Sequence, residues 1–515
     1  MRALLADPPM WPEARLASFL GDAVPEELDY EVELTGVTED EGGGEAAYTI
    51  TYSAADTDGA AALEGTLGLH YVEAASSWKV EWGRNSMWPG FQGRLIEVTK
   101  RWPRRAPILD RKGRVLARGP APARSYPFGA TAGSTVGHLG TVTRAEAAES
   151  DVYKQGDIAG ASGLEAAFDE RLAGTAGTRA VVVRNGPREE TLFRSDPLPG
   201  RPVRTTLDMR VQEAAAAAFG ATTGGAVVLD PRAGDILAVV SSAELNPELY
   251  VGARDVHPFN RALSGLYPPG SSLKVMTGAA ALETDTVNLR TRLTGPAEYK
   301  GVRNFESGEF GTIDFPTALK FSVNTAFAQI AEDLGGKRLT RYARLFGFNR
   351  PPAMPLGAAT SSFPRPEDLG DVMWGSIGQA QVLATPLQMA TVAATIANRG
   401  RRMEPRISMA VRPAAERVVS RRTASTMTRL MEGVVEGGTG VAARIAGVRV
   451  AGKTGTAEVD VNGKRMNHAW FVAFAPADDP QLAVAVVSEL GGIGGQVAAP
   501  LARGILQATL PLVPR

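Results

Sequence analysis

Residues 267–283 read YPPGSSLKVMTGAAALE and place Ser271 three positions before Lys274. Pro-Pro-Gly ahead of the serine predicts a sharp turn, and the alanine-rich apolar run after it predicts a helix. Residues three apart share one face of a helix, so we expect the Lys274 amine to reach the Ser271 hydroxyl. A serine needs a neighbouring base to become a nucleophile. Burial and the positive end of a helix dipole both favour the neutral amine that could serve as this base.

A second Ser-x-x-Lys pattern lies in residues 73–83, which read EAASSWKVEWG and pair Ser76 with Lys79. The alternation of polar and apolar residues predicts a β-strand here. On a strand, residues separated by an odd number of positions point to opposite faces, so these two side chains could not share a proton. A chain of this length contains about one such pattern by chance, and we interpret this stretch as a solvated strand and turn.

The overall composition excludes several kinds of chemistry. The chain has 515 residues, which predicts roughly two to four domains. It contains no cysteine, which excludes disulfides, thiolate zinc sites and cysteine nucleophiles. Its four histidines disfavour a multi-histidine metal site, and no metal is expected. The formal net charge of −1 provides no bulk field for nucleic acid, so no nucleic-acid partner is expected.

Residues 1–95 predict a small α+β domain. Residues 14–24 (ARLASFLGDAV) have the pattern of a short amphipathic helix. Polar and apolar residues then alternate in three stretches that predict half-buried strands: DYEVELTGV (29–37), AAYTITYS (46–53) and LEGTLGLHYVE (63–73).

Residues 96–205 are rich in arginine, proline and glycine and only weakly periodic. They predict an irregular, strand-poor domain with one helix near 162–173.

Residues 206–515 predict a larger domain in which strands lie at both ends and helices between them. Residues 208–219 predict a helix with Asp208 as its N-cap, and a further helix is expected from about residue 498. Buried strands are predicted in GGAVVLDPRAGDILAVVSS (224–242, a hairpin), HAWFVAFAP (468–476) and QLAVAVVSEL (481–490). The sheet of this domain should therefore combine strands from its beginning and its end.

Two further short motifs lie within this domain. Ser322-Val323-Asn324 can present a hydroxyl and an amide to a cleft from a turn or helix start, or the serine can be a simple helix N-cap.

The second motif is Lys453-Thr454-Gly455, which is followed by Thr456. On an edge strand, these residues would offer a cation and two hydroxyls to a carboxylate, and the small Gly455 would let a ligand lie along the strand. Alternatively, this stretch is a hairpin turn. The order SxxK, SxN, KTG within one domain is much more specific than any one motif alone.

With these three motifs, the chain resembles the class B penicillin-binding proteins over nearly its whole length. PGSSLK and KTGTAE match the family patterns, and AWFVAFAP matches the strand that follows KTG. Residues 378–400 (GQAQVLATPLQMATVAATIANRG) and 437–440 (GGTG) resemble two further family segments.

Upstream, residues 105–117 (RAPILDRKGRVLA) are similar to the opening of the family's pedestal domain, although Ala106 replaces the usual glycine. GASGLEAAFDERLAG resembles the family's Ser-Gly-Leu-Glu segment. The first domain, ending WKVEWGRNSMWPGF, resembles the NTF2-like extension of the subgroup that includes the methicillin-resistance transpeptidase.

The resemblance implies a multidomain α+β protein. It would have an NTF2-like domain (1–95), an irregular pedestal domain of the dimerisation type (96–205) and a penicillin-binding transpeptidase domain (206–515). The last would be similar to serine β-lactamases, with a central antiparallel sheet flanked by helices.

The implied activity is the cross-linking of peptidoglycan stem peptides through a serine acyl-enzyme, with covalent inhibition by β-lactams and no cofactor. Ser271 would attack the carbonyl between two terminal D-alanines, Lys274 would take its proton, and Ser322 would relay that proton to the leaving group. Lys453 would assist Ser322. The implied substrate-binding residues are Asn324 for the acyl-side amide and Lys453, Thr454, Gly455 and Thr456 for the terminal carboxylate, with the N–H groups of Ser271 and Thr456 as the oxyanion hole.

Three alternatives stay open on the residues. A β-lactamase or β-lactam sensor of the same fold would share SxxK and KTG, but rapid deacylation needs an activated water. A D,D-carboxypeptidase would use water as the acceptor. A non-catalytic cell-wall scaffold would recruit other proteins.

The expected partners are stem peptides, β-lactams and a glycosyltransferase or other cell-wall synthesis proteins. The substrate implies a location at the outer face of the bacterial cell membrane. The start, MRALLADPPMWPEARL, has no signal-peptide pattern, and no apolar run approaches 18 residues. We therefore expect the anchor or export signal to be absent from this chain.

Overall fold

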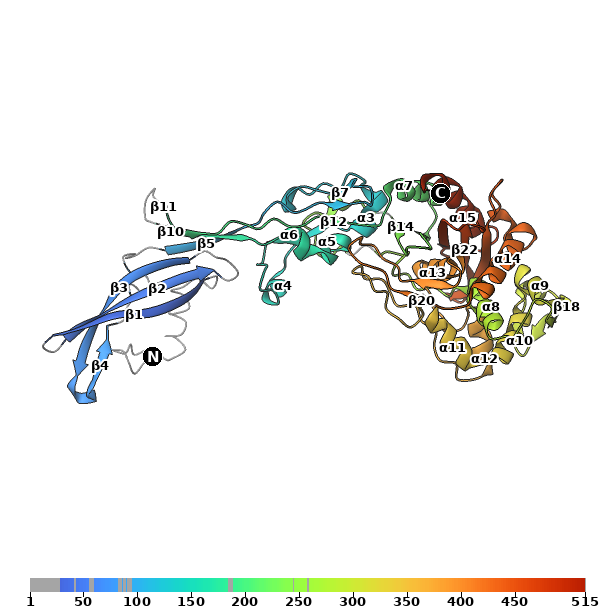
Figure 1. The fold of residues 1–515 in the computed structure, drawn as a ribbon, viewed down its shortest axis with the longest axis horizontal. Helices are drawn as coiled ribbons and strands as arrows, with labels where there is room; N and C mark the ends of the chain where they lie inside the picture. The colour runs from blue at the N-terminus through green and yellow to red at the C-terminus, as the bar shows by residue number, and fades with distance from the viewer. Residues whose placement is uncertain are drawn as a thin grey trace. The chain divides into compact units, whose positions relative to one another are not determined.

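The computed structural model describes residues 28–40, 43–54, 60–81, 86, 89, 95–183, 189–243, 245–256 and 259–514 (Figure 1). Contacts divide the chain into two compact units. One comprises Met1–Ala106 and Ala173–Arg201, and the other comprises Pro107–Leu172 and Pro202–Arg515. The segment 96–205, expected as one middle domain, thus contributes to both units. The helix expected at 14–24 lies outside the described residues.

Within its described residues, the first unit contains two antiparallel sheets with strand orders β1-β2-β3-β4 and β11-β10-β5. The three stretches expected as strands are strands in the structure. Alternate residues of β2 point into the core, where Tyr48, Ile50 and Tyr52 are buried with Leu28 and Ala180. The NTF2-like assignment stays a prediction. The strands are β1 Leu28–Asp40, β2 Gly43–Ala54, β3 Ala60–Val72, β4 Ser77–Val80, β5 Leu95–Arg101, β10 Gly177–Val183 and β11 Glu189–Arg194.

The second Ser-x-x-Lys pattern is only partly on a strand, which corrects the expectation. Ser76 closes a 3₁₀ turn, η2 (Glu73–Ala75), and has a left-handed backbone with φ of 45°. Strand β4 begins one residue later and contains Lys79, which lies opposite His70 of β3. The sharp reversal between β3 and β4 needs a residue with positive φ, and alternation alone does not reveal this requirement.

The middle of the chain is more regular than predicted. Instead of one helix near 162–173 there are two short ones, because α5 ends at Ala167 and the next residue, Phe168, has a φ of −124° that is not helical. Several strands have only two or three residues, too few to show a period of two in the sequence. The short elements are α3 Ala130–Val136, α4 Arg144–Ala148, α5 Gly163–Ala167, α6 Asp169–Ala173, β6 Ile108–Leu109, β7 Val115–Ala117, β8 Leu139–Thr141, β9 Ile158–Gly160 and β12 Val203–Arg204.

The second unit is built on a five-stranded antiparallel sheet with the order β14-β13-β23-β22-β21. The predicted hairpin and the predicted union of strands from both ends of the domain are confirmed. Strand β21 lies at one edge and carries the KTG motif. The strands are β13 Gly224–Leu229, β14 Ile236–Ser241, β21 Ala451–Val461, β22 Lys464–Ala475 and β23 Leu482–Ser488.

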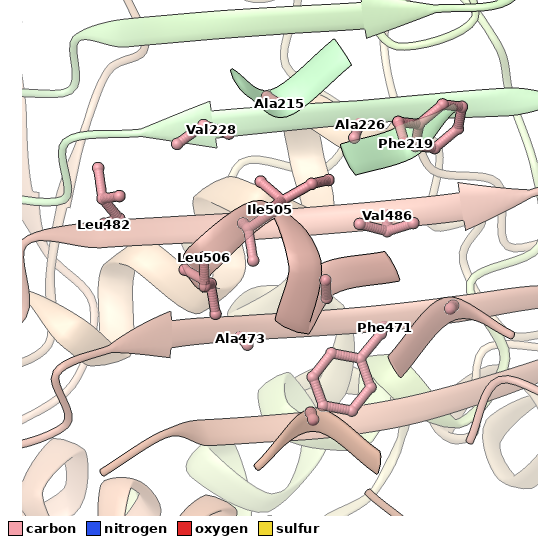
Figure 2. Close-up of a cluster of buried hydrophobic side chains, with 14 of the residues drawn as sticks. Ala215, Phe219, Ala226, Val228, Phe471, Ala473, Leu482, Val486, Ile505 and Leu506 are labelled. Atoms are coloured by element: carbon pink, nitrogen blue, oxygen red, sulfur yellow. The ribbon is translucent and has the colours of Figure 1, made fainter. Parts of the chain in front are cut away.

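Helices cover both faces of this sheet. On one face, Phe219 of α7 (Met209–Phe219) packs beside Ala226 of β13, and Ile505 of α15 (Ala498–Thr509) lies over the strand that carries Val486, as Figure 2 shows. Both helices were predicted, and Asp208 caps α7 by accepting a hydrogen bond of 3.1 Å from the Arg210 amide. Helix α13 (Pro386–Ala397) covers the other face.

The remaining elements of this unit lie outside the five-stranded sheet, and two of them, α8 and α10, carry residues of the serine motifs (Figure 1). They are α8 Lys274–Glu283, α9 Phe315–Lys320, α10 Asn324–Leu334, α11 Gly336–Leu345, α12 Leu369–Ser376, α14 Arg421–Gly437, β15 Arg292–Gly295, β16 Glu298–Tyr299, β17 Val302–Arg303, β18 Gly311–Asp314, β19 Arg401–Met403 and β20 Ala415–Arg417. None of the helices within the described residues is both long and apolar enough to cross a bilayer.

Candidate active site

Ser271 lies in a single 3₁₀ turn, η5 (Gly270–Leu273), that leads directly into α8. Gly270 has a φ of 53° and donates its N–H to the Gly378 carbonyl oxygen at 2.8 Å. The turn thus lies at the start of a helix, as expected from Pro-Pro-Gly. The hydrogen bond to Gly378, a residue far along the chain, holds it in place.

The Lys274 amine is fully buried and donates to oxygens of the SxN motif. It lies 2.6 Å from Asn324 Oδ1, 2.8 Å from the Ser322 carbonyl oxygen and 3.3 Å from Ser322 Oγ. Ser271 Oγ lies 3.5 Å from the same Asn324 Oδ1. The direct hydrogen bond expected between Lys274 and Ser271 is not among the contacts of the described residues. The amine bonds amide and carbonyl oxygens instead, and the two side chains meet at Asn324.

The SxN motif lies between α9 and α10. Ser322 has a left-handed backbone, with φ of 58°, and its Oγ accepts a second hydrogen bond, of 2.8 Å, from Lys453 Nζ. Asn324 is the first residue of α10, and its Nδ2 donates to the Arg303 carbonyl oxygen at 2.8 Å. The N-cap of α10 is Val323, so the alternative that Ser322 is merely a helix cap is wrong.

The KTG motif lies in the middle of β21 rather than in a turn, so the hairpin alternative is wrong. The fully buried Lys453 amine also donates to the Thr454 carbonyl oxygen at 2.9 Å. Thr454 Oγ1 is 2.6 Å from Thr439 Oγ1, and Thr456 Oγ1 accepts the Gly494 N–H at 3.2 Å.

Gly455 lets the edge strand approach the nucleophile turn. A Cβ at this position would lie 2.7 Å from the Pro269 carbonyl oxygen and 3.0 Å from the Ser272 amide nitrogen. Both are backbone atoms that cannot rotate away. The side chain of every other amino acid would therefore push β21 away from η5.

Burial favours the neutral form of both lysines. It lowers the pKa of Lys274 well below its ordinary value, and the nearby charge of Lys453 lowers it further. Burial alone lowers the pKa of Lys453 to about 7. Among the described residues, no carboxylate forms an ion pair with either amine. The Lys274 amine can thus be neutral and accept a proton while the Lys453 amine is protonated.

The structure brings six of the eight predicted site residues into one network of hydrogen bonds, from Ser271 to Thr454. Thr456 lies on the same strand but contacts Gly494 instead, and Gly455 provides the close approach of β21 to the nucleophile turn. The sequence interpretation missed two contributors: Thr439, which contacts Thr454, and Gly494, which contacts Thr456. The GGTG resemblance pointed to the first without giving it a role. No signal pointed to Gly494.

Comparison with known proteins agrees with this geometry. Residues 224–507 match the family model of the penicillin-binding protein transpeptidase domain. Residues 119–205 match the penicillin-binding protein dimerisation domain.

Named relatives share this likeness. The peptidoglycan D,D-transpeptidase MrdA of Acinetobacter baumannii is 30% identical over 73% of this chain and 64% of its own length. The peptidoglycan D,D-transpeptidase PbpA of Mycolicibacterium smegmatis is 37% identical over 61% of this chain and 73% of its own.

Solved structures are also similar. Pseudomonas aeruginosa PBP2 in complex with WCK 5153 superposes with a TM-score of 0.70 at 30% identity, over 80% of this chain and 97% of that one. The penicillin G acyl-enzyme complex of penicillin-binding protein A from Mycobacterium tuberculosis gives 0.64 at 30% identity, over 79% and 99%.

The fold and the three motifs thus define a serine acyltransferase of the penicillin-binding type. The chain belongs to the penicillin-binding protein transpeptidase family, within its class B, as its sequence resemblance indicated. The predicted fold class of a multidomain protein with a dimerisation-type domain and a C-terminal transpeptidase domain is confirmed.

Proposed function

We propose that this protein is a peptidoglycan D,D-transpeptidase that cross-links stem peptides through an acyl-enzyme on Ser271. The observation that carries the proposal is the convergence of two fully buried lysine amines on Ser322 Oγ, with the Lys274 amine and Ser271 Oγ meeting at Asn324 Oδ1. Such an arrangement supplies a neutral base and a path for the proton.

In the acylation step, Ser271 Oγ attacks the carbonyl carbon between the two terminal D-alanines. The proton of the serine passes to the neutral Lys274 amine as the new C–O bond forms. The oxyanion is stabilised by the backbone N–H groups of Ser271 and Thr456, which need to lie at about 2.7–3.1 Å from it. The terminal carboxylate binds to the Lys453 ammonium and to the hydroxyls of Thr454 and Thr456.

Ser322 completes the transfer. Its Oγ lies between Lys274 and Lys453, so it can pass a proton to the departing D-alanine nitrogen as the peptide bond breaks. The amide of Asn324 aligns the acyl side of the donor. An amine of a second stem peptide then attacks the ester, and Ser271 regains its proton.

A matched pair of reactions tests this function. The protein is incubated with a donor ending in D-alanyl-D-alanine, with and without an amine-bearing stem peptide, and products are identified by mass spectrometry. We expect the cross-linked peptide when the acceptor is present. Release of hydrolysed donor alone would indicate a D,D-carboxypeptidase, and absence of both products would indicate a scaffold.

A second measurement separates the transpeptidase from a β-lactamase. The ring fragment that a β-lactam leaves on Ser271 blocks the acceptor, and among the described residues no carboxylate contacts Lys274 to help it activate a water. We expect the adduct to persist far longer than an ordinary enzymatic turnover of ~10 s⁻¹. Sustained multiple turnover of a chromogenic cephalosporin would overturn the transpeptidase assignment.

We further propose that the segment matched by the dimerisation model belongs to a pedestal domain within residues 96–205, between an NTF2-like domain (1–95) and the catalytic domain (206–515). The relatives are cell-wall synthesis proteins, which supports action at the outer face of the cell membrane and a glycosyltransferase as a partner. Co-purification of the protein with such a synthase from membranes would test the partner.

A further inference from the structure

The segment 489–497 (ELGGIGGQV), which we call the β23–α15 loop, contacts the KTG strand directly. The Gly494 N–H donates to Thr456 Oγ1 at 3.2 Å. A Cβ at position 494 would overlap the Gly455 carbonyl oxygen, so only glycine brings the loop this close to β21. The loop thus reaches a hydroxyl that the proposed function assigns to the substrate carboxylate.

The Gly494 contact affects the direction of the Thr456 hydroxyl. A hydroxyl has one hydrogen and two lone pairs. When Thr456 Oγ1 accepts the Gly494 N–H, one lone pair is occupied and the hydrogen must point elsewhere. Because Thr456 is partly exposed on the edge strand, that hydrogen is available to a carboxylate lying along β21.

The loop begins with a conformation that needs support. Leu490 has a left-handed backbone with φ of 51°, which is unfavourable for a leucine. Its N–H donates to Nδ1 of His468 on β22, at 3.1 Å. The acceptor role of Nδ1 requires a neutral imidazole with its proton on Nε2. Burial lowers the pKa of His468 and so favours this neutral form.

Other side chains hold His468 and the start of the loop in place. The His468 ring packs edge-on against Tyr267, with centroids 5.3 Å apart. The Tyr267 hydroxyl donates to Glu489, which also accepts from Arg261 Nε at 2.9 Å. Tyr267 lies four positions before Ser271, so this cluster connects the loop to the nucleophile turn as well as to the KTG strand.

We propose that His468 is a positioning residue for substrate carboxylates. Its Nδ1 fixes Leu490 and hence the β23–α15 loop, so that Gly494 orients the Thr456 hydroxyl toward the carboxylate of the acyl donor. This inference rests on the proposed function, because it assumes that the carboxylate lies along β21. It predicts that His468 matters for ligands with a free carboxylate and little for ligands without one.

Two substitutions separate the hydrogen bond from simple packing. His468→Asn keeps an acceptor, because the amide Oδ1 is bonded to Cγ as Nδ1 is in histidine. His468→Leu removes the acceptor. Acylation rate constants are measured for both full-length variants with benzylpenicillin and with its methyl ester, and folding is checked by thermal unfolding.

We expect His468→Leu to slow acylation by benzylpenicillin about tenfold, the value of one hydrogen bond of ~1.4 kcal/mol. Acylation by the ester should change less than twofold, and His468→Asn should restore most of the loss. Equal losses for acid and ester, or no rescue by asparagine, would overturn the positioning role. If the unaltered protein forms no Ser271 adduct with either compound, the proposed function fails instead.

Thr456→Val adds a double-mutant cycle that tests whether His468 acts through this hydroxyl. It removes the hydroxyl that the loop is proposed to orient. In the Thr456→Val background, His468→Leu should cause no additional loss with benzylpenicillin, because the hydroxyl it acts through is gone. Additive losses would show that His468 acts by another path.

Discussion

The two Ser-x-x-Lys stretches share a pattern and differ in almost everything around it. Ser271 lies in a 3₁₀ turn that runs into a helix, and its lysine is fully buried. Ser76 is an exposed residue that closes a turn, and Lys79 is half-buried on a short strand. The local spacing is the same, and in the first stretch both side chains meet at one partner, Asn324.

The difference shows that this motif acquires its chemistry from residues remote in sequence. The Lys274 amine bonds Ser322, 48 positions away, and Ser322 bonds Lys453, a further 131 positions along the chain. Burial by this assembly is what lowers the pKa of Lys274. The predictions below remove these contributions one at a time.

The largest effect is expected from the base itself. Lys274→Ala should slow acylation by benzylpenicillin by ~10²–10⁴-fold, the range typical of a positioned general base. Lys79→Ala should leave the rate unchanged. Stopped-flow or quenched mass spectrometry measures both constants. A Lys274→Ala rate within a factor of three of the unaltered protein would show that another group takes the proton.

The cost of burying Lys453 should appear as a pH-dependent stability. Its pKa is about 7 in the folded protein and near 10.5 when unfolded, so between these values the unfolded chain binds more protons. Stability should therefore rise with pH from about 7 towards 10.5. In Lys453→Met this contribution is absent. Between pH 7 and 9, the free energy of unfolding of the unaltered protein should rise by ~2–3 kcal/mol relative to that of Lys453→Met.

Denaturant unfolding at each pH measures this difference, provided that both proteins have the same dependence on denaturant. A difference that does not vary with pH would mean that Lys453 keeps its proton throughout.

Removing Lys453 should also weaken recognition of carboxylates. Lys453→Ala should raise the activation free energy of acylation by a carboxylate-bearing β-lactam by about 1.5–3 kcal/mol, which is the value of a hydrogen bond to a charged group. The fold should be retained. Acylation kinetics and circular dichroism provide the measurement and its control. An unaltered acylation rate would make Lys453 a structural lysine of the edge strand.

The smallest effect is expected at the glycine that joins the two motifs. Gly455→Ala should cost about 1–3 kcal/mol of stability, because its Cβ meets backbone atoms of the nucleophile turn. Gly433→Ala is a matched control, since that glycine lies in α14 with open space around it, and alanine there should be stabilising. Equal effects of the two substitutions on melting temperature would contradict the close approach of β21 and η5.

The sequence was sufficient for the features that depend on local pattern. Apolar runs located the two strands that follow the KTG strand, and Asp208 marked the start of α7. Pro-Pro-Gly correctly placed Ser271 at a helix start.

Features that depend on remote contacts were missed. The spacing of Ser271 and Lys274 led to the expectation of a direct hydrogen bond, but the amine bonds Asn324, which no local rule could place beside it. The contact of Gly494 with Thr456 likewise depends on how a loop crosses the sheet edge. The left-handed backbone of Ser76 follows from the reversal between two strands and not from the serine itself.

The assignment of the nucleophile is tested most directly by peptide mapping after labelling with penicillin. The protein, Ser271→Ala and Ser76→Ala are each incubated with benzylpenicillin, digested and sequenced by tandem mass spectrometry. We predict a single adduct on Ser271 in the unaltered protein and in Ser76→Ala, and none in Ser271→Ala. An adduct that survives Ser271→Ala, or one lost in a folded Ser76→Ala protein, would contradict the assignment of Ser271 as the nucleophile.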